Sequence, residues 1–143
     1  MASSNFAGKS VHNRHADQEI ENEIQAKGLT APRVTPAEIE ANIDRAFYFT
    51  AAQGAEKSAR DAGSYAAGEP HHGKALGLLT FCVLVMRNGF TVTGESACAS
   101  PENFNAEIGR KIARENAVAK IWPLMGYELK CRLAREAQQG CSA

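Results

Sequence analysis

Residues 78–93 read LLTFCVLVMRNGFTVT, and this stretch decides the fold. Two runs rich in β-branched, aromatic and other apolar residues flank the dipeptide Asn88-Gly89. Asn-Gly between two such runs is a strong hairpin signal, because both residues accept the positive φ angles of a type I′ turn. The stretch therefore predicts a β-hairpin over residues 78–95. A two-residue loop at Asn88-Gly89 would place Val85 opposite Val92.

The two faces of this hairpin differ in composition. One face is apolar throughout and is the predicted core face; its members are Phe81, Val83, Val85, Phe90 and Val92. The other face places Cys82, Leu84 and Met86 opposite threonines and a glutamate. That face is too apolar for full exposure and too polar for a deep core. We therefore predict that Cys82, Leu84 and Met86 contribute to a contact between subunits of a homo-oligomer. The small folded part of the chain favours the same conclusion, because fewer than about 80 residues build only a thin core.

Three helices are predicted around the hairpin. Thr35-Pro36-Ala37-Glu38 combines a capping hydroxyl, a proline at the first helical position and a glutamate three residues after the cap. This pattern begins a helix over residues 36–50. Ser100-Pro101-Glu102 begins a second helix over residues 101–122. The next proline, Pro123, should kink or end it, because proline lacks the N–H that continues the hydrogen-bond ladder. A third helix follows over residues 124–137.

These elements form one domain of the α+β class, at residues 35–137. Residues 1–34 are predicted to be a polar tail with a short helix. Residues 53–74 contain several glycines among alanines and charges, and we predict a mobile loop there, with a weak helical turn around residues 55–60. Residues 138–143 are predicted to be a C-terminal tail.

The composition excludes several classes of protein. The chain has 143 residues, 44% of them hydrophobic, and 16 basic residues balance 16 acidic ones. This apolar content and zero net charge exclude a fully disordered chain. They also argue against a dedicated duplex-DNA-binding protein, which would carry a basic excess. The sequence shows no signal peptide and no apolar run long enough to cross a bilayer. We therefore expect a cytoplasmic protein without a membrane partner.

Catalytic and metal-binding motifs are not convincing. Gly94-Glu95-Ser96-Ala97-Cys98 follows a strand, as the nucleophile elbow of hydrolases does, but its last position is not glycine and all four histidines precede the serine. Cys98 also lacks an adjacent base. The histidines within residues 12–15 and 71–72 have no partner at a recognisable metal-ligand spacing. No glycine-rich phosphate loop is present. The sequence therefore predicts a non-enzymatic protein with no cofactor and no metal.

The densest basic group lies in the second predicted helix, at Arg110, Lys111 and Arg114. Lys111 has a glutamate four residues away on each side, and these pairs would neutralise it. Arg110 and Arg114 share another side of the helix, from which two guanidinium groups can hold a phosphate or a carboxylate. We predict Arg110 and Arg114 as ligand-binding residues, with Asn116 as a weaker candidate. The alternatives are a solvated helix face or structural ion pairs.

Long strings of this chain are similar to one known pattern. They include Arg87-Asn88-Gly89-Phe90-Thr91-Val92-Thr93-Gly94-Glu95-Ser96-Ala97-Cys98, Glu107-Ile108-Gly109-Arg110-Lys111-Ile112-Ala113-Arg114-Glu115-Asn116-Ala117 and Ile121-Trp122-Pro123-Leu124. From about Thr35 to Leu133 the chain resembles the gene-49/gene-66 family of small tailed-phage and prophage proteins. The resemblance implies a phage-encoded protein in the cytoplasm of the bacterial host. It carries over no catalytic residue.

Two function classes follow from these observations. The first is a non-enzymatic accessory protein that acts on a host pathway as a counter-defence, either by binding a host protein or by sequestering a small nucleotide signal. The second is a nucleic-acid-binding accessory factor that uses Arg110 and Arg114. Zero net charge and few exposed aromatic candidates weigh against the second class.

Overall fold

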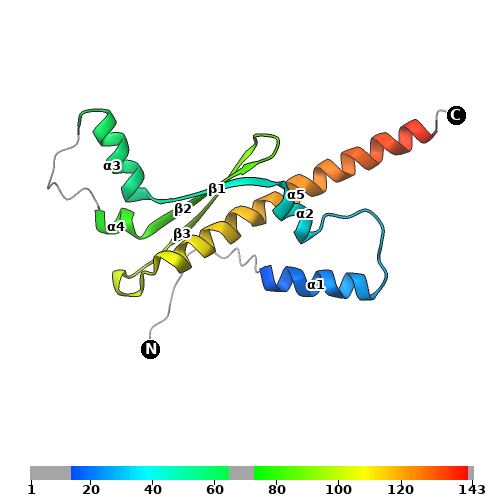
Figure 1. Ribbon diagram of the computed structural model, residues 1–143, viewed down its shortest axis with the longest axis horizontal. Coiled ribbons are helices and arrows are strands. Elements are labelled where there is room, and N and C mark those ends of the chain that lie inside the picture. Colours follow the sequence, from blue (N-terminus) through cyan, green and yellow to red (C-terminus); the bar gives the residue numbers. More distant parts are fainter. Residues whose placement is uncertain (1–13, 65–72, 142–143) are drawn as a thin grey trace.

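Three antiparallel strands and one long helix make up the centre of the molecule (Figure 1). The computed structural model describes residues 14–64 and 73–141. The sheet has the order β1-β2-β3, with β1 (Ile43–Thr50), β2 (Leu79–Met86) and β3 (Thr91–Ala97). The other elements are α1 (Arg14–Ala26), α2 (Pro36–Asn42), α3 (Ala51–Asp61), α4 (Gly73–Gly77), the 3-10 turn η1 (Pro101–Asn103) and α5 (Ala106–Gly140). The predicted α+β class and the hairpin are confirmed.

The hairpin register is shifted by one residue from the predicted one. Leu84 lies opposite Val92, and Val85 lies opposite Thr91. The loop has three residues, because the Met86 N–H donates to the Phe90 carbonyl at 2.8 Å and the Gly89 N–H donates to the Met86 carbonyl at 2.8 Å. Among the three loop residues, only Gly89 takes a positive φ angle, of 85°. A two-residue type I′ turn would need a positive φ at the preceding asparagine as well, so the chain uses a longer loop with a glycine bulge.

The predicted core face of the hairpin is wrong, and so is the predicted subunit contact. Cys82, Leu84 and Met86 are almost fully buried in the core beneath α5, together with Val92. They are therefore not available on the surface for a contact between subunits. The face opposite α5 instead carries Phe81, Val83 and Val85, which are only half-buried. Both faces of β2 are apolar, so alternation alone did not indicate which one the helix covers.

Small residues on α5 and β3 determine which face the helix covers. Gly109, Ala113, Ala117 and Ile121 recur every four residues on α5 and form its buried stripe. Ala113 and Ala117 lie against Gly94 of β3, where an added Cβ would stand 2.1 Å from the Ala113 carbonyl oxygen and 2.3 Å from the Ala117 nitrogen. The backbones of helix and strand therefore touch directly. This close approach is possible only on the face that lacks a side chain at position 94.

The predicted helix over residues 36–50 is a helix followed by a strand. The capping box at Thr35 and Glu38 is present, but α2 ends at Asn42 and β1 pairs with β2 from Ile43 onward. The apolar residues Ile39, Ile43 and Phe47 imitate a helical stripe. In fact Ile39 is buried, whereas Phe47 lies half-exposed on the opposite face of the sheet. β-branched and aromatic residues favour a strand once a neighbouring strand is available.

The segment after β1 is more helical than predicted: the weak turn expected around residues 55–60 is the full helix α3, Ala51–Asp61. Thr50 and Gln53 form a second capping box, which begins α3, and α4 precedes β2. The remainder of the predicted loop, residues 65–72, lies outside the described residues.

The two predicted C-terminal helices are one helix. Residues 101–103 form only the turn η1, and α5 begins after Asn105, whose side chain accepts a hydrogen bond from the Ile108 N–H at 3.0 Å. Helix α5 continues through Pro123 to Gly140, past the predicted start of a tail at residue 138. The buried Ile121 before the proline and the half-buried Met125 after it both pack on the core. These contacts hold both sides of the proline in one helix despite the lost hydrogen bond. The last turns of α5 extend past the sheet (Figure 1).

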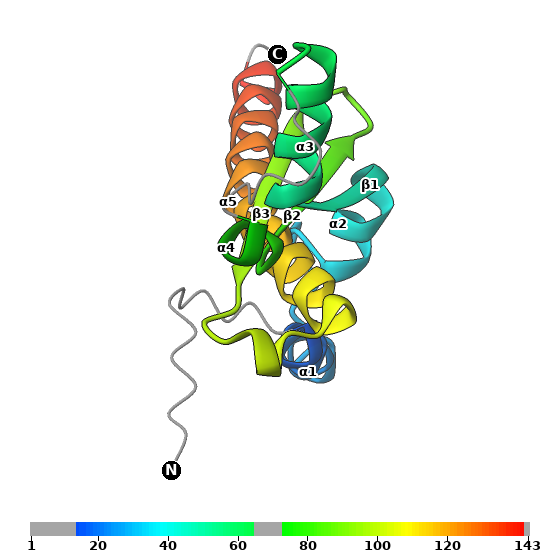
Figure 2. The ribbon, with the colours of Figure 1, turned by 90° about the vertical axis from the view of Figure 1, so that its left-hand side faces the viewer.

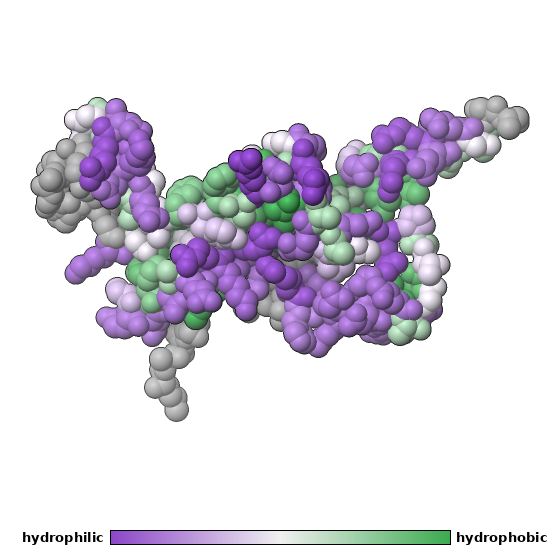
Figure 3. Space-filling view, in the orientation of Figure 1, coloured by the Kyte–Doolittle hydropathy of each residue, from purple (hydrophilic) through white to green (hydrophobic). Residues whose placement is uncertain are grey.

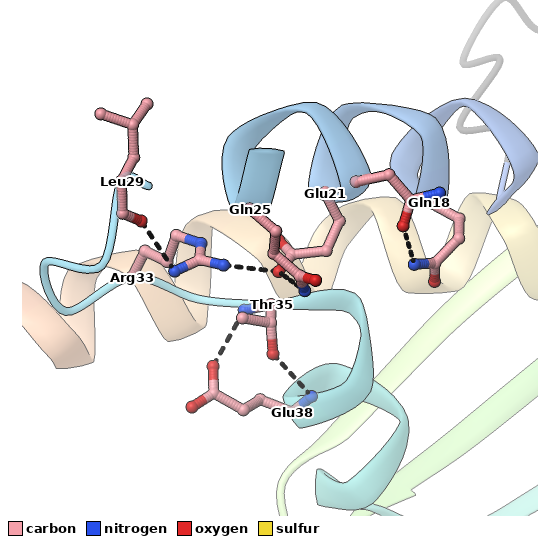
Figure 4. Close-up of polar contacts among 8 residues, drawn as sticks. Gln18, Glu21, Gln25, Leu29, Arg33, Thr35 and Glu38 are labelled. Carbon is pink, nitrogen blue, oxygen red and sulfur yellow. Dashed lines mark hydrogen bonds and ion pairs between the residues drawn. The ribbon is translucent and has the colours of Figure 1, made fainter. Parts of the chain in front are cut away.

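Helix α1 is attached to the body mainly by polar contacts. The buried Glu21 carboxylate accepts a hydrogen bond from Arg33 at 2.5 Å and another from Gln25 at 2.8 Å (Figure 4). Arg33 also donates to the Leu29 carbonyl, so it ties α1 to the segment that enters α2. The apolar Ile20 and Leu29 remain exposed. In Figure 2, as in Figure 1, α1 lies below α2, on the lower side of the molecule.

Candidate ligand-binding site

Arg114 lies at the junction of α5, α2 and β1. Its guanidinium donates to the Glu40 carboxylate of α2 at 2.7 Å, and its side chain is only 17% exposed. Burial alone would lower the pKa of Arg114, but Tyr48 of β1 and the Glu40 carboxylate act in the opposite direction and leave its pKa above the ordinary value. Arg114 therefore carries a permanent, largely desolvated positive charge.

Tyr48 and Cys82 complete the surroundings of Arg114. The two residues lie opposite one another on β1 and β2. Burial raises the pKa of the Cys82 thiol, while Tyr48 and the Arg114 charge act to lower it. Cys82 is therefore a neutral core thiol. Tyr48, by contrast, is 36% exposed and presents its ring beside the arginine.

Arg110 stands one helical turn before Arg114 on the same side of α5, as the four-residue spacing predicts. Its side chain is exposed. Within residues 14–64 and 73–141, no carboxylate forms an ion pair with it. The structure therefore brings the two predicted arginines together, one held by Glu40 and the other directed to solvent.

Asn116 belongs to a different part of the surface. A two-residue offset turns it about 200° from Arg114 around the helix. Its amide donates to the Glu95 carbonyl of β3 at 2.8 Å. The three predicted ligand-binding residues thus divide into an arginine pair on the β1 side of α5 and an asparagine on the β3 side.

A groove of about 690 Å³ lies next to the arginine pair, between α1, α2 and α5. Buried Ile39 and Val118 form its floor. Its rim carries charges of both signs, from Arg14, His15, Lys111, Glu40 and Glu115. Glu40 separates this groove from the arginine pair, because its carboxylate contacts Arg114 at 2.7 Å and Arg14 at 4.0 Å.

Sequence reasoning missed Glu40 and Tyr48. Glu40 is 74 positions away from Arg114, and nothing in its local pattern distinguishes it from other helix-surface acids. Tyr48 lies within the predicted helix over residues 36–50, which gives no reason to bring it to the arginine. Only the pairing of β1 with β2 brings both residues to α5.

The histidines considered and rejected above as metal ligands fall partly outside the described residues. His12, His71 and His72 lie there. His15 is described and faces Glu19 at 3.2 Å on the same helix. Within the described ranges, no group of three histidine, cysteine or acidic side chains is arranged to hold a metal ion. In the same ranges, none of the helices is long and apolar enough to span a bilayer.

The comparisons with known proteins give one match. Searches of the curated proteins and of the solved structures found none. The model of the family described as "Phage protein (N4 Gp49/phage Sf6 gene 66) family" matches residues 34–133. The match covers the sheet, α2 and the part of α5 that carries both arginines. The chain therefore belongs to the phage protein family of N4 Gp49 and phage Sf6 gene 66.

Proposed function

We propose that this phage protein is a non-enzymatic binding protein that counters host defence by sequestering a small anionic nucleotide signal. The observation that supports this function best is the arginine pair, Arg110 and Arg114, on the side of α5 from which Arg114 reaches Glu40 of α2 and Tyr48 of β1. Two guanidinium groups one turn apart can each hold a phosphate with paired hydrogen bonds. The exposed ring of Tyr48 adds a surface on which a base can stack.

The environment of Arg114 suits a reversible anion site. Its charge is poorly solvated, so a phosphate that reaches it gains more than it would from a fully hydrated lysine or arginine. When no ligand is bound, the Arg114 guanidinium is paired with the Glu40 carboxylate. A ligand phosphate must therefore compete with this carboxylate, and removal of the Glu40 charge should strengthen binding.

The first experiment is calorimetric titration of the purified protein with a panel of cyclic and linear nucleotides, with nucleosides as the uncharged comparison. We expect at least one nucleotide to bind and the matching nucleoside not to bind. Replacing both arginines, as Arg110→Ala with Arg114→Ala, should abolish binding. The matched control is Arg132→Ala with Arg135→Ala, which removes two exposed arginines from the last turns of the same helix. Unchanged binding in the first double variant would remove the site from consideration.

A single substitution separates binding from a structural role. Glu40→Gln breaks the same ion pair as Arg114→Ala but keeps the guanidinium. If Arg114 serves the ligand, Glu40→Gln should bind the nucleotide several-fold more tightly, whereas Arg114→Ala should bind it at least tenfold more weakly. If the pair serves only to join α2 to α5, both variants should lose similar stability and neither should change affinity. That result would contradict the proposal.

The alternative function is nucleic-acid binding through the same arginines. Single-stranded oligonucleotides provide the comparison, because their affinity depends steeply on salt concentration. Tight oligonucleotide binding with no affinity for mononucleotides or cyclic nucleotides would favour the alternative. Zero net charge argues for the small ligand.

A further inference from the structure

The two edge strands of the sheet differ in the hydrogen bonding of their outward-facing backbone groups. At the β3 edge, side chains of α5 bond to outward-facing carbonyls. The Lys120 ammonium donates to the Thr93 carbonyl at 2.6 Å, and the Asn116 amide donates to the Glu95 carbonyl at 2.8 Å. Lys120 also contacts the Glu95 carboxylate at 3.7 Å. A long charged side chain on an edge blocks the approach of another strand. The β3 edge is therefore closed.

The β1 edge is open at two residues. The Met86 N–H donates to the Phe90 carbonyl, and the Leu78 carbonyl accepts from the Cys98 N–H. The backbone groups of even-numbered residues on β2 therefore point toward β3, and those of odd-numbered residues point toward β1. The matching positions on β1 are odd-numbered as well. Ala46 and Tyr48 therefore direct their N–H and C=O groups away from the sheet. Nothing in the described part of the chain hydrogen-bonds to these four groups.

Both ends of the open segment are limited. The next outward-facing N–H, that of Thr50, donates to the Gln53 side chain at 2.9 Å and is occupied by the α3 cap. At the other end, the register shifts between Ile43 and Arg45, and this irregularity interrupts regular pairing. The free edge is therefore only a few residues long and centres on Phe47.

We infer that a second copy of this chain pairs on this edge, with β1 antiparallel to β1 about a two-fold axis at Phe47. In this register Ala46 lies opposite the partner's Tyr48, and Tyr48 opposite the partner's Ala46. The two pairs exchange four hydrogen bonds, which use every open N–H and C=O on both copies. The result is one six-stranded sheet with an isologous contact.

Side chains along β1 fit the same register. Phe47 is 50% exposed and meets its symmetry mate across the axis. Phe49, 39% exposed, lies opposite the partner's Arg45, where ring and guanidinium attract. A register centred on Arg45 would instead place two like charges opposite one another. In Figure 3 hydrophobic residues gather over β1 and β2, and the pairing covers part of this surface.

A second copy fits this edge better than an unrelated extended peptide. A foreign strand gains most from a long edge with regular pairing, and this one is blocked after two outward-facing residues. A two-fold pair does not require a longer edge. Each copy contributes its four open backbone groups, and the proposed register pairs all eight of them. Tyr48 lies beside Arg114, so the pairing also brings the arginine sites of the two copies near the axis. The inference itself does not depend on any ligand.

The experiment measures mass in solution. Light scattering of the full chain at about 100 µM should give twice the chain mass of 15.4 kDa. Ala46→Pro removes an outward N–H without breaking a bond to β2, and it should give a folded monomer. The matched control is Thr93→Pro, which makes the same change on the closed β3 edge and should remain a dimer. A wild-type monomer, or a dimeric Ala46→Pro variant, would overturn the inference.

Cross-linking tests the register even if the proline variant does not fold. In a background where Cys98, Cys131 and Cys141 are serine, Phe47→Cys should form an intermolecular disulfide on mild oxidation. The two Cα atoms would lie about 4.5 Å apart across the axis. Arg45→Cys should not cross-link, because its symmetry mate would be about 13 Å away along the strands. Cross-linking at position 45 and not at 47 would contradict the register.

Discussion

The absence of one side chain at position 94 allows the helix to lie directly on the sheet. Any Cβ there would collide with the α5 backbone at Ala113 and Ala117, neither of which can move without moving the whole helix. The sequence offers no local sign of this role, since Gly94 follows a strand pattern and resembles a bulge or strand end. The role of Gly94 becomes evident only from its contact with the small residues Ala113 and Ala117 of α5.

Gly94→Ala should therefore destabilise the fold by about 3 kcal/mol or more, because rigid backbone and not a flexible side chain opposes the added methyl group. Urea unfolding measures the change. Gly126→Ala is the matched control on α5, where an added Cβ meets nothing within 4 Å. It should stabilise the helix by roughly 0.5–1 kcal/mol. Equal stability of Gly94→Ala and wild type would show that the close approach is not required.

At the scale of elements, local signals found the hairpin and the start of α2, but not which surfaces meet. Asn88-Gly89 identified the turn, and Thr35-Pro36 identified a true cap. Helical spacing correctly placed Arg110 and Arg114 on one side of α5. The covered face of β2 could not be inferred, because both faces are apolar and the choice depends on Gly94 in another strand. Strand β1 was missed because Ile39, Ile43 and Phe47 happen to match a helical period.

Helix α5 contains an internal proline that its packing tolerates. Pro123→Ala restores one backbone hydrogen bond at an exposed position and should stabilise the protein by about 1–3 kcal/mol. The midpoint of urea denaturation should rise while the slope stays constant. A fall in stability would instead show that the proline shapes the helix so that Met125 reaches the core.

The stability that the contacts of α1 contribute to the folded state should depend on pH. Hydrogen bonds from Arg33 and Gln25 keep the pKa of Glu21 below its ordinary value of 4.5. The folded state therefore gains stability from Glu21 above pH 4.5, and this gain disappears as the pH falls through the lowered pKa. Thermal unfolding of wild type and Glu21→Gln should differ at pH 6, and the difference should shrink as the pH falls from 4.5 through the lowered pKa. Glu23→Gln, an exposed neighbour on α1, should show a smaller difference. A constant gap at all pH values would contradict the role of the Glu21 charge.

At the scale of the whole molecule, the residues of the buried core all fall within positions 39–121 of the sequence. The only buried residue of α1 is Glu21, and the family match begins at residue 34. Deletion of residues 1–33 should therefore leave a folded domain whose amide NMR spectrum keeps the dispersed signals of the sheet. Deletion of residues 121–143 removes Ile121 from the core and should unfold the chain. An unfolded product from the first deletion would show that α1 is part of the folding unit.

The contrast between the two sheet edges determines how far association can proceed. In polymer chemistry, a monomer with two reactive ends grows into a chain, whereas a monomer with one reactive end stops at a pair. With β3 closed by Lys120 and Asn116, a molecule that joins along β1 has no edge left for a third. The same contacts that attach α5 to the sheet thus terminate growth, so that high concentrations would produce pairs rather than fibrils.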